Sequence, residues 1–353
     1  MKYYIIAGEA SGDLHASNLM RGLRACDPAC EFRSFRGPAV MGIVEVISRM
    51  GSVLGTLSAC RNDLLAWQPD AVILVDYPGF NLRMARFAHR HGFKVFYYIA
   101  PKVWAHRAGR VRRLRRDVDA LYCIFPFELE WFRAHGIEPR YFGNPLSDNL
   151  AQWQARPMEG PRIALLPGSR KAELAFLMPR FAALEQLLAA DSRFAGYRLT
   201  IAAAPSLTQE DYKRYLPEDS RIELVTDRTY DVLASSQAAA ISSGTASLEA
   251  ALIGTPQVVC YGFKRLTWWI ARLSVKVRFA SLVNLCLGRE LVPELLQDAA
   301  SPARIFAELE KILTDGETAS RMRAGYDELR NLLGGEGASG RIANDIYEQT
   351  ARV

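Results

Sequence analysis

The sequence lacks the cysteine pairs and the long apolar runs that mark disulfide-linked, zinc-binding and membrane-spanning proteins. Its six cysteines are scattered and include no Cys-x-x-Cys pair, so we expect neither a disulfide framework nor a zinc site, and we expect a reducing compartment. No apolar run approaches the length of a membrane span, and no basic-then-apolar leader precedes the first apolar stretch. The sequence therefore predicts no membrane span and no signal peptide.

Two nucleotide-binding signatures are missing as well. The first apolar stretch, 3–7, leads into Gly8-Glu9-Ala10-Ser11-Gly12-Asp13, which is neither Gly-x-Gly-x-x-Gly nor a P-loop. We therefore expect this loop to bind something other than NAD or ATP. Its two glycines allow a sharp turn and the close approach of a ligand, and Ser11 or Asp13 is predicted to cap a helix that begins near Leu14.

The sequence does have the composition of a globular protein, with 50% hydrophobic and 23% charged residues. Short apolar runs alternate with amphipathic segments, which predicts βαβ units and an α/β fold. In the first half the expected strands cover 3–7, 31–35, 71–76, 94–99, 120–125 and 139–142. In the second half they cover 162–166, 198–203, 222–226, 238–242 and 257–261.

The length of 353 residues suits two domains. The polar segment 148–161, with two prolines and a glycine, is typical of a linker or a short crossover. We expect an N-terminal, Rossmann-like, doubly wound domain over 1–155 and a second one over 156–335, facing each other across a cleft. A C-terminal helix over about 336–353 could return to pack on the first domain.

Positive charge is concentrated in one segment, although the net charge is only +6. From Lys102 to Arg116 there are seven basic residues and no acid. This favours an anionic partner, such as a phospholipid surface, a phosphorylated ligand or nucleic acid, and a solvated helix face is the alternative. No aromatic residue is interleaved over 107–116 for base stacking, so we expect no nucleic acid.

Asp117 and Asp119 form an Asp-x-Asp pair, but neighbouring arginines favour ion pairing, so we expect no metal.

Residues 43–57 carry an apolar stripe at helical spacing, from Ile43 to Leu57, with few polar residues among them. We interpret the stripe either as a core-facing helix or as a surface for acyl chains or a membrane interface. The segment 261–279 combines paired tryptophans with basic residues. It suits a bilayer headgroup region and a buried interface equally well.

Two loops in the second half have the features of a phosphate-binding site. The expected strand 162–166 runs into Gly168-Ser169-Arg170, where a helix N-terminus and a guanidinium could hold a diphosphate. The expected strand 238–242 is followed by Ser243-Gly244-Thr245-Ala246, whose small residues allow phosphates to approach backbone amides. Glu249, one turn further, could accept hydrogen bonds from two ribose hydroxyls. Together the two loops predict a nucleotide site in the second domain.

In the first half, Asp76 follows an apolar strand and is a candidate general base beside the cleft. The alternative for this carboxylate is to cap the next helix or to pair with an arginine. His15 and Glu9 are candidates for the same catalytic role, and the residues alone leave the choice open.

Several segments, taken in order, form a specific pattern. They are Gly8 to Asp13, Met41 to Val46, Asp76 to Asn81, Pro101 to Ala105, Phe125 to Glu128, Gly143 to Pro145, Leu165 to Arg170, Ser243 to Glu249, and Asn284 with Gly288 to Val292. With this pattern the chain resembles the lipid-A-disaccharide synthase family over nearly its whole length. The resemblance implies the two-domain GT-B fold and an inverting glycosyl transfer without metal or cofactor. The sugar of UDP-2,3-diacylglucosamine would pass to the 6-hydroxyl of 2,3-diacylglucosamine 1-phosphate, giving the β-1,6-linked lipid A disaccharide 1-phosphate and UDP.

The resemblance also implies roles for individual residues. Catalytic roles are implied for Asp76 as the base, Arg170 near the donor phosphates, and Glu9. UDP binding is implied for Gly168, Ser169, Arg170, Ser243, Gly244, Thr245, Ala246 and Glu249. Acceptor binding is implied for Ser11, Gly12, Asp13, Asn81, Asn284, Arg289 and Glu290. The implied location is the cytoplasm, peripherally at the inner face of the inner membrane, with 43–57 and 102–116 toward anionic lipid; a homodimer is left open.

Two alternatives remain beside this function. One is another GT-B enzyme that uses a UDP-sugar, such as a 2-epimerase or an N-acetylglucosaminyltransferase, although an epimerase would not need the apolar 43–57 or the basic 102–116 segment. The other is a non-catalytic, lipid-binding homologue, because the segment after Phe35 is shorter than is usual in the family.

Overall fold

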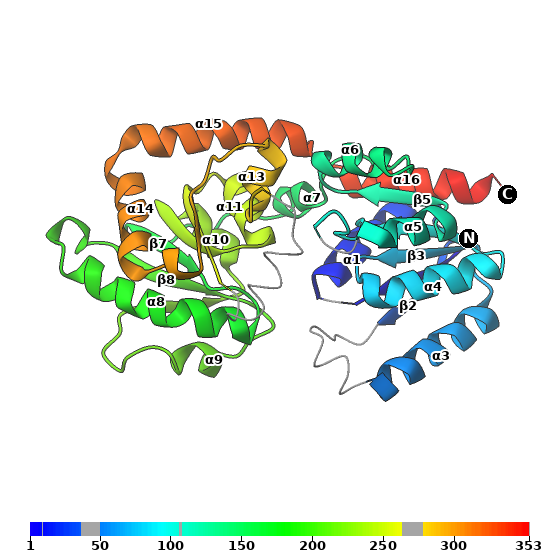
Figure 1. Ribbon diagram of the computed structural model, residues 1–353, viewed down its shortest axis with the longest axis horizontal. Coiled ribbons are helices and arrows are strands. Elements are labelled where there is room, and N and C mark those ends of the chain that lie inside the picture. The colour runs from blue at the N-terminus through cyan, green and yellow to red at the C-terminus, as the bar shows by residue number, and fades with distance from the viewer. Residues whose placement is uncertain (9, 37–49, 106–107, 263–277, 353) are drawn as a thin grey trace. The chain divides into compact units, whose positions relative to one another are not determined.

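The structure is a computed structural model that describes residues 1–8, 10–36, 50–105, 108–262 and 278–352 (Figure 1). Its internal contacts divide the chain into two compact units. Unit 1 consists of Met1–Asp148 together with Leu333–Val353, and unit 2 consists of Asn149–Leu332. The chain therefore leaves unit 1 once and returns to it for its C-terminal segment.

Unit 1 is built on a six-stranded parallel sheet. Its strands are β1 (Lys2–Ala7), β2 (Glu31–Arg36), β3 (Ala71–Val75), β4 (Lys94–Tyr98), β5 (Ala120–Cys123) and β6 (Arg140–Tyr141), in the order β2-β1-β3-β4-β5-β6. The inner strands are continuous apolar runs because helices cover both faces of a parallel sheet. All five residues of β3 are buried, and two of them, Val72 and Leu74, share a core cluster with Leu57, Leu64 and Phe80.

Seven α-helices and one short 3₁₀ turn are described in this part of the chain. They are α1 (Ala10–Cys26), α3 (Met50–Trp67), α4 (Pro78–Arg90), η1 (Ala108–Arg110), α5 (Val111–Asp117), α6 (Pro126–Ala134), α7 (Leu146–Ala151) and α16 (Ala338–Ala351). α4 contacts both α3 and α5, whereas α1 packs against α16. Gly22 permits the close approach of α1 and α16, since a Cβ on Gly22 would lie 2.7 Å from the Cβ of Ala343. The C-terminal helix is therefore part of the packing of unit 1.

Unit 2 repeats the same architecture. Its strands are β7 (Arg162–Leu166), β8 (Arg198–Ala203), β9 (Glu223–Thr226), β10 (Ala238–Ser242), β11 (Gln257–Tyr261) and β12 (Glu294–Leu296), all parallel, in the order β12-β11-β10-β7-β8-β9. Its described helices are α8 (Lys171–Ala189), η2 (Ser192–Phe194), α9 (Gln209–Lys213), α10 (Thr229–Ala234), α11 (Thr245–Ile253), α13 (Leu282–Leu287), η3 (Gln297–Ala299), α14 (Pro302–Thr314) and α15 (Gly316–Leu333). Every residue of β7 and β10 is buried, so these adjacent strands form the centre of the sheet.

The predicted α/β architecture is confirmed, and each expected strand is present. The short β12 was not predicted, because its three residues follow Pro293 and form no apolar run of their own. The predicted helix start near Leu14 is wrong, because α1 already begins at Ala10. Ser11 and Asp13 therefore lie inside the first turn of α1 and do not cap it from outside.

Much of the two apolar segments singled out in the sequence lies outside the described residues. Of the stripe over 43–57, the structure describes only the part that opens α3, in which Leu57 is 3% exposed and belongs to the core. Of 261–279, residues 263–277 lie outside the described part, as does the short segment after Arg36. Within the described ranges, no helix combines the length and the apolar character that crossing a bilayer requires.

Candidate functional site

Each sheet has one point at which the strand order reverses. In unit 1 the reversal lies between β1 and β3, and in unit 2 it lies between β7 and β10. In open α/β sheets, ligands bind beyond the carboxyl ends of the strands at this point. The loops after β1, β3, β7 and β10 are the four that carry the candidate catalytic and UDP-binding residues.

The backbone at Asp76 adopts an unusual conformation directly after β3. Asp76 and Tyr77 have φ values of 44° and 47°, in the left-handed region that non-glycine residues rarely occupy. Three hydrogen bonds hold this turn in place. The Asp76 amide donates to the Tyr98 carbonyl at 3.1 Å, and the Asp76 carbonyl accepts from Tyr97 Oη at 2.7 Å and from Asn81 Nδ2 at 2.8 Å. A strained backbone that several hydrogen bonds hold in place is often found at functional sites.

The carboxyl group of Asp76 is half-buried. Burial raises its pKa above the ordinary value, while the charge of Lys102 and a backbone hydrogen bond from Tyr77 act in the opposite direction. A raised pKa makes the carboxylate a better proton acceptor, provided that the pH is high enough to keep it ionised. In this electrostatic setting the Asp76 carboxylate could accept a proton.

Asn81 and Gly8 join the ends of β1 and β3. Asn81 is completely buried, and its Nδ2 faces the carbonyls of Ile6 at 3.4 Å and Val75 at 3.2 Å, in addition to that of Asp76. A Cβ on Gly8 would lie 2.3 Å from the ring of Tyr77, so only glycine fits against the turn after β3. Asn81, implied above as an acceptor-binding residue, is thus placed as a support of the backbone next to Asp76.

The structure describes the other candidate residues of the first loop only in part. Glu9 lies outside the described residues, and nothing is described of the side chains of Ser11 and Asp13. Gly12 is buried in the first turn of α1, where a Cβ would lie 3.7 Å from Ala7 and 3.8 Å from Val75. His15 is 8% exposed, and burial lowers its pKa to about 4, although the charge of Asp148 opposes this shift. The imidazole is therefore neutral at physiological pH.

At the same edge of the sheet in unit 1 lies a buried carboxyl group, that of Glu128, which the sequence placed in the family pattern without predicting a role for it. Glu128 in α6 is fully buried and accepts hydrogen bonds from Trp104 Nε1 at 2.9 Å and from the amides of Ile124 and Phe125, each at 3.2 Å. Burial raises its pKa to about 7, against these hydrogen bonds and the charge of Lys102. Glu128 ties the loop after β4 to the loop after β5, and its partner Trp104 lies 24 positions away in the chain.

In unit 2, the loop after β7 is organised by an acid from the following helix. Gly168 has a φ of 103°, and a Cβ there would lie 2.2 Å from Glu173 Oε2. Glu173 Oε2 accepts the amide of Ser169 at 2.9 Å, and Glu173 Oε1 pairs with Arg170 at 3.1 Å. Arg170 stands at the N-cap of α8 with about half of its side chain exposed (52%). The guanidinium is therefore both oriented and accessible to an anion.

The loop after β10 leads into α11, with Gly244 at the N-cap and Thr245 exposed in the first turn. Ser243 Oγ donates to the carbonyl of Ala280 at 2.8 Å. Glu249, one turn further along α11, accepts a hydrogen bond from Tyr230 Oη at 3.3 Å, and burial raises the pKa of its carboxyl group. The free amides at the start of a helix favour an anion, so this loop and the α8 N-terminus can both face phosphate groups.

Asn284 supports the segment that Ser243 contacts. It is completely buried and donates to Val292 O at 2.9 Å and Glu294 Oε1 at 2.8 Å, and it accepts the amides of Leu291 and Val292. All of its hydrogen-bonding capacity is used in this way. Asn284, implied above as an acceptor-binding residue, is thus placed as a brace between α13 and β12.

Glu294, which sequence reasoning missed, completes this brace by accepting the amides of Ala280 and Ser281 at 2.7 and 2.9 Å. The two remaining acceptor candidates, Arg289 and Glu290, are exposed, and Arg289 pairs with Glu328.

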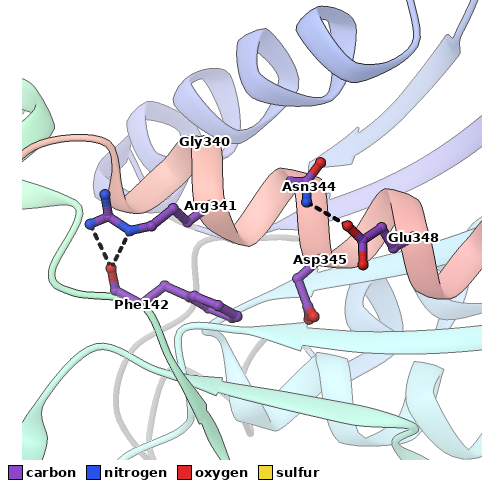
Figure 2. A pocket seen from close by; sticks show the side chains of 6 residues that line it. All are labelled: Phe142, Gly340, Arg341, Asn344, Asp345 and Glu348. Atoms are coloured by element: carbon purple, nitrogen blue, oxygen red, sulfur yellow. Dashed lines mark hydrogen bonds between the residues drawn. The ribbon is translucent and has the colours of Figure 1, made fainter.

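A separate hollow of about 410 Å³ lies along α16 in unit 1 (Figure 2). It is lined by Phe142, Gly340, Arg341, Asn344, Asp345 and Glu348. Arg341 donates to the Phe142 carbonyl at 2.8 and 3.2 Å, and Asn344 donates to Glu348 at 2.8 Å. The lining includes none of the candidate residues, and its carboxylate Asp345 is already bonded to Tyr122 and Arg140 outside the hollow, so the strand-end loops remain the candidate site.

Comparison with protein families gives one match over nearly the whole chain. A family model described as lipid-A-disaccharide synthetase matches residues 3–339. The lipid-A-disaccharide synthase of Myxococcus xanthus (strain DK1622) is 37% identical over 370 residues, covering 98% of this chain and 96% of that protein. The enzyme of the same name from Geobacter metallireducens (strain ATCC 53774 / DSM 7210 / GS-15) is 36% identical over 375 residues, covering 99% and 97%.

Solved structures that resemble this one are enzymes of the GT-B fold. The UDP-GlcNAc 2-epimerase of Neisseria meningitidis, bound to UDP-GlcNAc, has a TM-score of 0.68 at 12% identity and covers 99% of this chain and 100% of that one. UGT2 of Phytolacca americana, complexed with UDP-2fluoro-glucose and pterostilbene, has a TM-score of 0.59 at 13% identity, with 99% of each chain covered. At these identities the likeness concerns the fold alone, and it confirms the GT-B prediction.

Proposed function

The chain belongs to the lipid-A-disaccharide synthetase family and is a glycosyltransferase of lipid A biosynthesis, and from this premise we propose how its two units share the reaction. Family membership is the observation that carries the function, since the match spans residues 3–339. The donor is UDP-2,3-diacylglucosamine and the acceptor is 2,3-diacylglucosamine 1-phosphate. The products are the β-1,6-linked lipid A disaccharide 1-phosphate and UDP.

Asp76 is the proposed general base. It removes the proton of the acceptor 6-hydroxyl as that oxygen attacks C1 of the donor sugar. The bond between C1 and the diphosphate oxygen breaks at the same time, UDP leaves with the bonding electrons, and the configuration at C1 inverts. The raised pKa of Asp76 and its constrained backbone support this role.

The loops of unit 2 are the proposed UDP site. Negative charge grows on the diphosphate as it leaves, and stabilising that charge lowers the barrier. Arg170 and the helix starts at α8 and α11 can supply positive charge for this purpose. Gly168, Ser169, Ser243, Gly244, Thr245 and Ala246 are proposed to line the phosphates. Glu249 is proposed to bind the ribose.

Acceptor binding is proposed for the first loop of unit 1, where Glu9, Ser11 and Asp13 would orient sugar hydroxyls and Gly12 would allow close approach. Asn81 supports the turn after β3 in unit 1 from the interior, whereas Asn284 supports the segment beside Ser243 in unit 2, as their buried hydrogen bonds indicate. Arg289 and Glu290 are exposed and remain proposed acceptor contacts.

A peripheral position at the inner face of the inner membrane is proposed from the diacylated substrates and the basic segment. Both substrates carry acyl chains, which partition into a bilayer. Arg112 and Arg113 in α5, like Lys102 before it, are exposed and could contact anionic headgroups. The segment 43–57 is proposed to add apolar contacts with the bilayer, with the exception of Leu57, which is buried in the core.

The test is a reconstitution with both substrates in EDTA, with Asp76→Asn and Asp219→Asn as variants. We expect UDP and disaccharide from the native protein. Asp76→Asn should lower kcat by roughly 100-fold or more, because a general base contributes on this order, while its affinity for UDP changes little. Asp219 is exposed in unit 2, and its substitution serves as the matched control.

The outcomes separate the alternatives. UDP binding without any disaccharide would favour a non-catalytic homologue. Isomerisation of UDP-N-acetylglucosamine would favour a 2-epimerase. Turnover by Asp76→Asn at the native rate would exclude Asp76 as the base. Glu9 would then be the next candidate, because His15 is buried.

A further inference from the structure

Tyr230 in α10 holds the carboxyl group that is proposed to bind ribose. Its Oη donates to Glu249 Oε1 at 3.3 Å, from the helix that packs beside α11. Each carboxylate oxygen has two lone pairs, so Oε1 can accept this hydrogen bond and still accept one from a ribose hydroxyl. The contact therefore restricts the rotation of the Glu249 carboxylate without consuming its capacity to bind a ligand.

The ring of Tyr230 is itself fixed from another side. Trp153, in the segment that follows α7, meets it edge-on, with centroids 5.8 Å apart and an interplanar angle of 84°. Trp153 Nε1 donates to Asp231 Oδ1 at 3.0 Å, and Asp231 is only 1% exposed. Tyr230 is thus held by a neighbour whose own orientation is set by a buried carboxylate.

Asp231 makes this arrangement rigid. It also accepts the amide and the Nε of Arg156, each at 3.0 Å, and the Nε of Arg228 at 2.9 Å. Charge-assisted hydrogen bonds of this kind are stronger than neutral ones. Several such bonds to the single buried side chain of Asp231 fix the start of α10, where Tyr230 directly precedes Asp231.

From this geometry we infer that Tyr230 is a positioning residue that aims the Glu249 carboxylate at the ribose hydroxyls and so gives the enzyme its preference for a ribonucleotide donor. The inference rests on the proposed UDP site and adds the residue that determines sugar specificity within the nucleotide. Tyr230 acts through Glu249 and does not itself contact the ligand.

The experiment measures the affinity for UDP and for 2′-deoxy-UDP by titration calorimetry. The variants are Tyr230→Phe, which removes only the hydroxyl and keeps the ring on Trp153, and Tyr197→Phe as the matched control. Tyr197 packs on Phe194 in the same unit. We expect Tyr230→Phe to weaken UDP binding about tenfold, the typical effect of losing a hydrogen bond to a charged group, with 2′-deoxy-UDP affected much less.

The kinetic signature is a raised KM for the donor with kcat nearly unchanged, because ground state and transition state lose the same contact. In a Glu249→Gln background, Tyr230→Phe should have little further effect on the preference for UDP. The control should behave like the native protein in both assays.

Three results would overturn the inference. Equal weakening of both nucleotides would show a merely structural role for Tyr230. A native preference for UDP retained by Tyr230→Phe would remove Tyr230 while leaving the UDP site intact. A native protein that binds no UDP would overturn the nucleotide site itself and this inference with it.

Discussion

Glu128 is the residue whose ionisation should affect folding close to neutral pH. Its pKa is raised from the ordinary 4.5 to about 7 by burial, so the folded state holds a proton that the unfolded state releases. Its contribution to stability is therefore fully present below about pH 4.5 and is lost as the pH rises to about 7. Glu128→Gln removes this titration and also leaves one of three donors unmatched, which costs about 1–3 kcal/mol.

Urea unfolding at pH 5, 6, 7 and 8 tests this prediction. The deficit of Glu128→Gln relative to the native protein should be largest at pH 5 and should shrink toward pH 8. Glu130, exposed in the same helix, provides the matched control as Glu130→Gln. A deficit that is constant with pH would show that Glu128 does not titrate in this range.

For single residues, the sequence predicted which positions belong to the candidate site better than it predicted the role of each residue. Asp76 could be named because a carboxylate after an apolar strand is visible in the chain. Asn81 and Asn284 were assigned to the acceptor, yet both are buried and bonded to backbone groups. An amide near a strand end serves either purpose, and the sequence does not show which way it points. No role was predicted for Glu128 or Tyr230, because their partners are distant in the chain, 24 and 19 positions away.

Among the elements, strands were easier to predict than helix starts. A buried parallel strand is a short apolar run that stands out from its surroundings, as Ala71–Val75 does. The start of α1 was misplaced because Gly8-Glu9-Ala10-Ser11-Gly12 has the composition of a turn, whereas the helix already includes Ala10. Local propensity favoured the turn, but Gly12 is buried in the first turn of the helix, which only the tertiary structure could reveal.

The basic face of α5 leads to a prediction for the element as a whole. Val111 and Leu114 are buried while Arg112 and Arg113 are exposed, so the helix presents positive charge to the solvent. Each basic residue near an anionic bilayer is worth about 1 kcal/mol, so Arg112→Ser with Arg113→Ser should weaken binding to such vesicles about 30-fold. Sedimentation with vesicles containing phosphatidylglycerol measures the effect.

The control for α5 removes the same charge elsewhere. Arg321 and Arg323 are exposed in α15, and their replacement by serine lowers the net charge equally. Vesicle binding that falls by the same factor in both variants would show that net charge matters and that α5 has no special role. Loss of the native binding at 0.5 M salt is expected as well, because salt screens exposed charges.

For the whole molecule, the decisive feature is that the chain returns to unit 1. The carboxylate of Asp148, at the point where the chain leaves unit 1, accepts the amides of Gly337, Ala338 and Ser339 at 2.6, 3.2 and 2.8 Å. Gly337 is 189 positions away from Asp148. From the sequence, the packing of the C-terminal helix on the first domain was only one possibility. No local pattern connects an aspartate with amides that far along the chain.

Asp148→Ala should therefore loosen α16 without disturbing unit 2. Asp148 is 8% exposed and satisfies three amides at a helix start, where negative charge is favoured, so its loss should cost unit 1 about 2 kcal/mol. Limited proteolysis should then cut first near 333–337, and calorimetry should show unit 1 melting earlier while unit 2 melts as before. Asp219→Ala, in an exposed turn of unit 2, should change neither. A single melting transition that shifts as one would show instead that the two units unfold together and that α16 stabilises the whole chain.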